Sequence, residues 1–145
     1  PGIDRSRWAA VGHSAGGQLA LVAATRLSTA PRTVVSMGGV NDLVLAAEQG
    51  LGAGAAKAYA GEALAELSPR ALALSSPVVA AHGDRDDRVP HVHAERLVEA
   101  VATAGGRAQL LTISGGGHFD HLEPDHPAWA LVADVLVDAL TGRQT

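Results

Sequence analysis

Three short segments carry side chains that together could perform nucleophilic catalysis. The segment VGHSAGG places Ser14 between two glycines with the spacing G-x-S-x-G. Further along, HGDRDDRVP contains Asp86, and SGGGHFDH contains His118. A serine hydroxyl is a weak nucleophile until a histidine removes its proton, and a carboxylate must orient that histidine. The three segments therefore supply one complete set of candidates: Ser14 as nucleophile, His118 as base and Asp86 as acid.

Each of these candidates has a competing interpretation. A G-x-S-x-G match arises by chance in roughly one chain in ten of this composition, and Ser14 could lie in an ordinary glycine-rich turn. The run DRDDR could be a solvated loop, and it offers Asp84 and Asp87 as further acids. His121 is a second candidate for the base, and His118 could be a loop histidine without a role. The predicted strands and helices that carry these residues distinguish between the interpretations, because they determine whether the candidates can meet.

The remaining histidines have simpler interpretations. His13 belongs to the turn of the nucleophile itself, so we expect it to pack beside Ser14 rather than to act as the base. His82 lies within the end of a predicted strand, and we expect a structural role for it. His91 and His93 have the spacing H-x-H of some metal sites, but no suitable third ligand is near, so we expect surface positions. We predict neither a metal nor an organic cofactor.

Apolar strands alternate with helical segments along the chain. RWAAVG reads as a buried strand that ends at the serine motif, and AGGQLALVAATRLS after it is long enough for about four helical turns. Gly16 and Gly17 fall in the first turn of that helix at a cost of roughly 1 kcal/mol each, which indicates a close backbone approach. Residues 41–76 predict short helices and loops. Further strands are predicted over 32–40, 76–83 and 107–114, and further helices over 91–104, ending at Gly105, and 127–140, capped by Asp125 or His126 and ended by Gly142.

This alternation is typical of an α/β fold. We expect about four parallel strands flanked by helices on both faces, a three-layer αβα arrangement. Active sites of such sheets lie beyond the carboxyl ends of the strands. Ser14, Asp86 and His118 each follow a predicted strand, so they can meet at one edge. The backbone N–H of Ala15, at the start of the helix, is the predicted donor to an oxyanion.

Composition excludes several classes of function. The chain has 145 residues, 47% hydrophobic and 18% charged, which rules out a wholly disordered protein. Its net charge is −4, without a basic run, and we expect neither a nucleic-acid nor a membrane partner. There is no cysteine, so disulfides, a thiolate nucleophile and a cysteine zinc site are excluded. We expect a cytoplasmic protein whose partner is a small ester or amide substrate.

The same segments resemble a known family. VGHSAGGQLAL, SPVVAAHGDRDDRVP and GGGHFDHLEP look like the nucleophile elbow, acid loop and histidine loop of α/β-hydrolase-fold serine hydrolases. The resemblance is nearest to the esterase/lipase group that includes kynurenine formamidase-like enzymes and the C-terminal domains of prolyl oligopeptidase-like peptidases, and it runs from about Ile3 to Leu140. The family pattern H-G-x-x-D-x-x-V-P places the acid at Asp86, and the pattern G-x-G-H-F places the base at His118.

The position of the elbow departs from the family. There the elbow lies near the middle of the chain, and an upstream His-Gly-Gly-type loop completes the oxyanion hole. The resemblance therefore implies that residues 1–145 are the C-terminal half of an α/β-hydrolase domain, with 41–70 as a lid-like segment over the pocket. Its first strand would be an exposed apolar edge that could self-associate. Because loss of one oxyanion donor costs about 100- to 1000-fold in turnover, we expect impaired activity from this chain alone.

The function expected from these residues is hydrolysis of a carboxylic ester through a Ser-Asp-His triad and an acyl-enzyme. A serine peptidase and an arylformamidase-type amide hydrolase are alternatives with the same chemistry. A non-catalytic α/β module that pairs through its strand edge is an alternative from another class.

Overall fold

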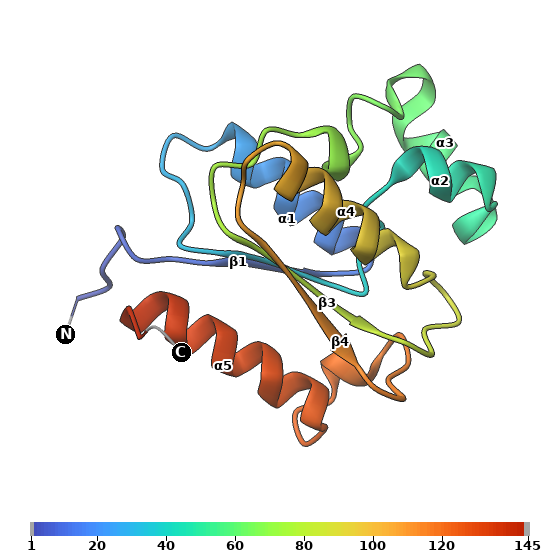
Figure 1. Cartoon of the computed structure of the whole chain (residues 1–145). Helices are drawn as coiled ribbons and strands as arrows, with labels where there is room; N and C mark the ends of the chain where they lie inside the picture. The colour runs from blue at the N-terminus through green and yellow to red at the C-terminus, as the bar shows by residue number, and fades with distance from the viewer. Residues whose placement is uncertain (1, 144–145) are drawn as a thin grey trace.

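The computed structural model describes residues 2–143, and in them four parallel strands form one sheet in the order β1-β2-β3-β4. Helices cover both faces of this sheet (Figure 1), so the predicted three-layer α/β fold is confirmed. The strands are β1 (Ala10–His13), β2 (Val34–Met37), β3 (Val78–Gly83) and β4 (Ala108–Ile113), and the α-helices are α1 (Ala15–Arg26), α2 (Leu43–Glu48), α3 (Ala55–Ala60), α4 (Val92–Thr103) and α5 (Pro127–Thr141).

All four strands are shorter than the sequence predicts, and the structure explains the difference for β1 and β2. β1 begins at Ala10 rather than at residue 7, because the Asp4 carboxylate accepts hydrogen bonds from the backbone N–H of Ser6 and from Arg7 and holds this stretch in a turn. β2 ends at Met37, because Gly38 has a φ of 52° and turns the chain out of the sheet. This early exit from β2 brings backbone to the edge of the sheet where the candidate residues gather.

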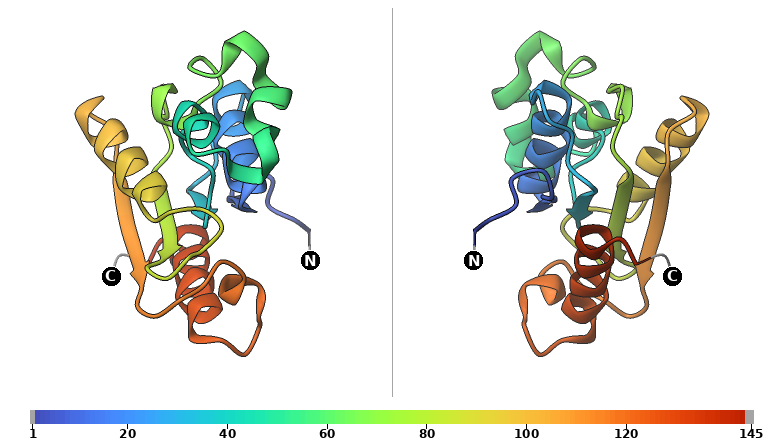
Figure 2. Two further views of the ribbon diagram at one scale, coloured as in Figure 1. Left: turned by 90° about the vertical axis from the view of Figure 1, so that its right-hand side faces the viewer. Right: turned by 90° about the vertical axis from the view of Figure 1, so that its left-hand side faces the viewer.

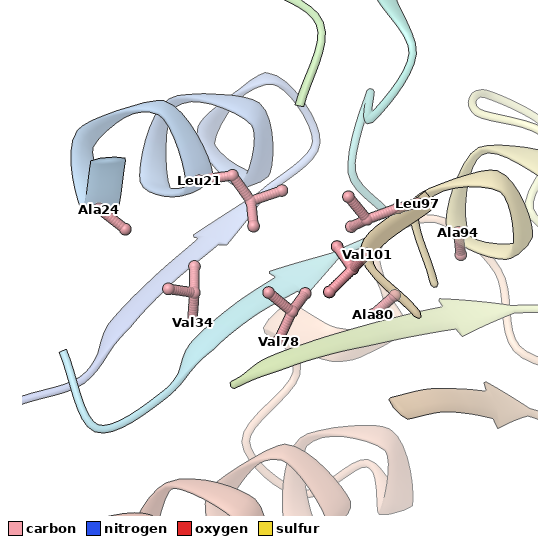
Figure 3. Packing of buried hydrophobic residues seen from close by; sticks show 8 residues of the cluster. All are labelled: Leu21, Ala24, Val34, Val78, Ala80, Ala94, Leu97 and Val101. Atoms are coloured by element: carbon pink, nitrogen blue, oxygen red, sulfur yellow. The ribbon is translucent and has the colours of Figure 1, made fainter. Parts of the chain in front are cut away.

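The sheet is buried between two apolar layers. On one face, Leu21 of α1 and Leu97 and Val101 of α4 pack against Val34 and Val78 of the inner strands (Figure 3). Helix α5 covers the other face (Figure 2). There Val132 of α5 forms a second core with residues of β2 and β3. Every residue of β2 and β3 is buried, which explains their continuous apolar sequences.

Residues 41–70 form a separate small unit beside α1, away from α5 (Figures 1 and 2). The unit has its own apolar cluster, which includes Leu43 of α2 and Ala56 of α3. Buried Asp42 fastens it to α4: its carboxylate lies 3.1 Å from Arg96 of that helix. Within the unit the same carboxylate caps α2 at the N–H of Leu45 and lies 2.7 Å from Arg70 Nε. The unit is thus held against α4 by a charged anchor, and the buried residues of its apolar cluster lie within the unit itself.

The last helix follows the predicted signals. The His126 side chain accepts a hydrogen bond from the N–H of Ala128 and caps α5, and Gly142, with a φ of 75°, ends it. Across residues 2–143, no helix combines the length and the apolar character needed to cross a membrane.

Candidate active site

Ser14 lies at the sharp turn between β1 and α1. Its backbone angles are φ 56° and ψ −122°, a region that residues other than glycine rarely adopt. Hydrogen bonds over-determine this conformation: the N–H of Ser14 donates to the carbonyl of Met37 at 2.9 Å, and its carbonyl accepts from Gly17 and Val40. The side chain makes no capping hydrogen bond to α1. The backbone of Ser14 is therefore fixed by hydrogen bonds, and its hydroxyl does not cap α1.

The glycines around Ser14 have different roles. A Cβ on Gly12 would collide with the carbonyl of Gly16, so strand and helix approach each other closely at this point. A Cβ on Gly17 would lie 2.5 Å from Ser36 Oγ, which explains the glycine in the buried first turn of α1. A Cβ on Gly16 would meet nothing within 4 Å. Of the two glycines in the motif, only Gly12 is required by packing.

Asp86 and His118 form a buried pair. Nδ1 of His118 donates to Oδ2 of Asp86 at 2.7 Å, and the two side chains are 5% and 0% exposed. The other carboxylate oxygen, Oδ1, accepts from the backbone N–H groups of Arg88 and Val89. Burial raises the pKa of Asp86, but the hydrogen bonds from His118 and the backbone outweigh it, so the pKa lies below its usual value. Asp86 is therefore a carboxylate that can fix the orientation of the His118 ring.

Gly38, just after β2, completes the packing around this pair. A Cβ on Gly38 would lie 3.2 Å from both Asp86 Oδ2 and His118 Nδ1, and its φ of 52° also favours glycine. The sequence analysis assigned no role to Gly38 and Gly39, the two glycines of the segment SMGGV. Their position at the end of a central strand was the signal that could have indicated a contact with the candidate pair.

A cavity of about 430 Å³ lies over the end of the sheet. Ser14, Ala15 and His118 line it together. The N–H of Ala15 belongs to the first turn of α1, where backbone donors have no acceptor within the helix. The other walls of the cavity are largely apolar and include five residues of the 41–70 unit: Leu43, Ala46, Leu51, Ala56 and Tyr59. The nucleophile, base and oxyanion donor proposed from the sequence thus share one apolar cavity.

The competing acids and base lie elsewhere. Oδ1 of Asp84 accepts a hydrogen bond from the N–H of Gly115 at 2.7 Å, and Asp87 is largely exposed beside Arg88. His121 is fully buried, and neither of its ring nitrogens has a hydrogen-bond partner among the described residues. Burial lowers the pKa of His121 to about 4. None of the three contacts the Asp86–His118 pair through a hydrogen bond that the described residues contain.

The expectation of a surface position is wrong for His93. Its side chain is fully buried, and its ring nitrogens bind the backbone N–H of Asp42 and the side chain of Gln49. The reason is its place on α4, where it shares the buried face with Leu97 and Val101. His91 lies partly exposed and bridges Glu95 and Thr112. In residues 2–143 no group of three or more metal-ligating side chains lies together.

His13 packs against the histidine loop. Its Nε2 donates to the backbone carbonyl of His118 at 2.6 Å, and the two rings lie 4.5 Å apart. This contact ties the loop that carries the candidate base to the turn that carries the candidate nucleophile. The sequence predicted that His13 packs beside Ser14, but it did not predict the contact of His13 with the loop of His118.

Comparison with known proteins identifies the family and the fold of this chain. The model of the prolyl oligopeptidase family matches residues 2–135. Among solved structures, an acylaminoacyl peptidase in complex with a chloromethyl ketone superposes with a TM-score of 0.80 at 19% identity, over 98% of this chain and 25% of that one. A puromycin-hydrolyzing peptidase of Mycobacterium tuberculosis gives 0.68 at 28% identity, over 79% and 19%. A truncated carbohydrate esterase from gut microbiota gives 0.78 at 20% identity, over 96% and 61%.

The chain spans only about a quarter of the length of the acylaminoacyl peptidase. No curated protein sequence matches it. The family model nevertheless covers nearly the whole chain, and the parallel four-stranded sheet with helices on both faces agrees with the fold that the resemblance implies. The chain therefore belongs to the prolyl oligopeptidase family of α/β-hydrolase-fold serine hydrolases.

Proposed function

We propose that this protein hydrolyses a carboxylic ester, with Ser14 as nucleophile, His118 as general base and Asp86 as the acid that orients His118. One observation carries the proposal: the 2.7 Å hydrogen bond from His118 to Asp86 lies beside a cavity that Ser14 also lines. The constrained backbone of Ser14 supports it, because such strain persists where the surroundings over-determine it, as at active sites.

The reaction would proceed in two stages. Ser14 Oγ attacks the carbonyl carbon of the substrate, and His118 Nε2 takes the hydroxyl proton. The N–H of Ala15 stabilises the tetrahedral oxyanion, and Asp86 stabilises the protonated His118. His118 then gives its proton to the leaving alcohol, and an acyl-enzyme remains. Water, activated by the same histidine, hydrolyses the acyl-enzyme and restores the serine.

The cavity favours a substrate with an apolar group next to the scissile bond. Leu43, Leu51 and Ala56 line the cavity and would be desolvated by such a group, at about 25 cal/mol per Å² of apolar area removed from water. A volume of about 430 Å³ is within the range of sites for small organic ligands. We propose a small ester with an apolar acyl or alcohol part.

An amide or peptide bond is the second candidate for cleavage, including the arylformamidase type. It is supported by the family and by the peptidases among the similar structures. A pair of substrates with the same acyl group, one a p-nitrophenyl ester and the other a p-nitroanilide, separates the two. An esterase cleaves only the ester at a useful kcat/KM, whereas an enzyme for peptides cleaves both.

A non-catalytic role through the sheet edge is the candidate from another class. Within residues 2–143, β1 is an edge strand that pairs only with β2, and Val11 on it is 44% exposed. Such an edge can pair with a second copy. Light scattering of the protein over a range of concentrations tests this, and a monomer at every concentration would contradict self-association.

The test of the enzymatic proposal is covalent labelling. A fluorophosphonate probe reacts with an activated serine, so we expect the wild-type protein to be labelled and Ser14→Ala to lose the label completely. Ser6→Ala is the matched control, because Ser6 is exposed in the N-terminal turn and lies outside the cavity. Labelling that survives in Ser14→Ala would show that Ser14 is not the nucleophile.

A further inference from the structure

His82 is a buried side chain that the proposed reaction does not use. It is the penultimate residue of β3, and its side chain is completely buried. Its Nε2 lies 2.8 Å from the carbonyl oxygen of Val89 and 3.2 Å from Oδ2 of Asp86. The residue therefore connects the end of the strand to both ends of the turn that carries the proposed acid.

The protonation of His82 follows from these contacts. A carbonyl oxygen only accepts hydrogen bonds, so the ring must carry its hydrogen on Nε2. Burial lowers the pKa of His82, which keeps the ring neutral. Nδ1 is buried without a hydrogen-bond partner among the described residues, and in this tautomer it holds a lone pair rather than an unsatisfied N–H. The single N–H points to the side where Val89 and Asp86 lie.

Val89 makes this contact relevant to the acid. The N–H of Val89 donates to Oδ1 of Asp86 at 2.8 Å, while its carbonyl accepts from His82. The Asp86 carboxylate is thus held at Oδ1 by the turn and at Oδ2 by His118, and His82 supports both sides. Without His82 the Val89 end of the turn would lose its hydrogen bond to β3, while the hydrogen bond from the N–H of Asp86 to the carbonyl of Gly83 would remain. We therefore expect Oδ2 of Asp86 to shift relative to Nδ1 of His118.

We propose that His82 is a positioning residue, which fastens the Asp86 turn to β3 through the carbonyl of Val89 and keeps its Nε2 3.2 Å from Asp86 Oδ2, so that the Asp86–His118 hydrogen bond keeps its geometry. The proposal rests on the proposed function for its effect on catalysis. The effect on the Asp86–His118 hydrogen bond does not depend on it.

The experiment compares His82→Leu with His82→Gln. Leucine fills the site but has no hydrogen-bond donor. Glutamine keeps a donor, because its Nε2 can reach the position of the histidine Nε2–H. The first readout is the downfield proton NMR resonance of His118 Nδ1–H in the full-length protein. We expect it to weaken or disappear in His82→Leu and to persist in His82→Gln. The second readout is ester hydrolysis, where we expect kcat to fall about 10- to 100-fold in His82→Leu with KM nearly unchanged, and to recover in His82→Gln.

His93→Leu is the matched control, because His93 is equally buried but binds the 41–70 unit rather than the acid turn. It is expected to lower the free energy of unfolding and to leave the His118 resonance intact. If His82→Leu does not fold, His82→Asn takes its place, since its amide ends short of Val89 and Asp86.

Two results would overturn the proposal. One is a His118 resonance in the folded donor-free variant that is indistinguishable from wild type. The other is an equal loss of kcat and of the His118 resonance in His82→Gln and His82→Leu when the two variants have the same free energy of unfolding. Loss of the probe label in Ser14→Ala is scored separately, so failure of the proposed function would be recognised as such.

Discussion

One methyl group is enough to distinguish the two glycines that flank Ser14. A Cβ on Gly12 would collide with the backbone of Gly16, and backbone cannot move as a flexible side chain can. We expect Gly12→Ala to destabilise the fold by about 1–3 kcal/mol and to abolish probe labelling of Ser14. A Cβ on Gly16 meets open space, so Gly16→Ala should keep the label and raise helix stability by up to about 1 kcal/mol. Urea unfolding measures the stability of each variant, and the rate of probe labelling measures the reactivity of Ser14. Equal stability and equal labelling of the two variants would contradict the role given to Gly12.

The second prediction at the residue scale concerns Gly38. Alanine there must adopt a φ of 52° and brings its methyl group to 3.2 Å from Asp86 Oδ2 and His118 Nδ1. We expect about 1–2 kcal/mol of backbone strain and at least a tenfold loss of kcat with little change in KM. Gly105→Ala is the control, because it has the same left-handed strain at a φ of 78° with nothing within 4 Å of its Cβ. If both variants lose activity equally, strain rather than the contact explains the loss.

At the scale of elements, the 41–70 unit depends on one buried charge. Asp42 caps α2 and pairs with Arg70 and Arg96, whose side chains are 44% and 45% exposed. Asp42→Ala removes the cap and both ion pairs, and since the arginines can turn to water we expect a loss of about 1–3 kcal/mol. Faster amide hydrogen exchange in α2 and a raised KM should accompany it, because this unit lines the cavity. Glu99→Gln is the control, because Glu99 is an exposed residue of α4. It should leave the free energy of unfolding, the amide exchange in α2 and KM unchanged.

Helix α4 explains one success and one failure of the sequence analysis. The apolar positions Leu97 and Val101 predicted a helix over 91–104, and the structure has it at Val92–Thr103. His93 lies four residues before Leu97 and is therefore on the same buried face. The H-x-H spacing drew attention to a metal site instead, and the periodicity of the helix was not applied to the histidines. The helical periodicity of the sequence thus already contained the information that places His93 on the buried face.

At the scale of the whole molecule, topology could be predicted but contacts between strand ends could not. Alternating strands and helices indicate a parallel sheet, and that rule brings Ser14, Asp86 and His118 to the same edge without any knowledge of strand order. The contact of Gly38 with Asp86 is different, because it requires β2 to lie beside β3 in the observed register. Likewise, the bridge from His82 to Val89 depends on how the acid turn folds back on its own strand.

The whole molecule should also lose stability in mild acid, because it buries neutral histidines. Burial lowers the pKa of His93 and of His121 to about 4, and it lowers the pKa of His82 as well. In the unfolded chain these rings bind a proton near pH 6.5, so between about pH 6.5 and pH 4 the unfolded state holds more protons than the folded state. The free energy of unfolding must therefore fall as the pH decreases through this range, by roughly 2 kcal/mol per ring with a pKa near 4 between pH 7 and pH 5.

Urea unfolding at pH 7 and pH 5 measures this loss, and a variant assigns it to individual rings. His121→Phe removes a buried ring that makes no hydrogen bond among the described residues, so it should lower the difference between the two pH values by about 2 kcal/mol. Gly16→Ala is the control, because it changes no titratable side chain and its Cβ meets open space, so its difference between the two pH values should match the wild type. An unchanged difference in His121→Phe would mean that His121 is not held neutral in the folded protein.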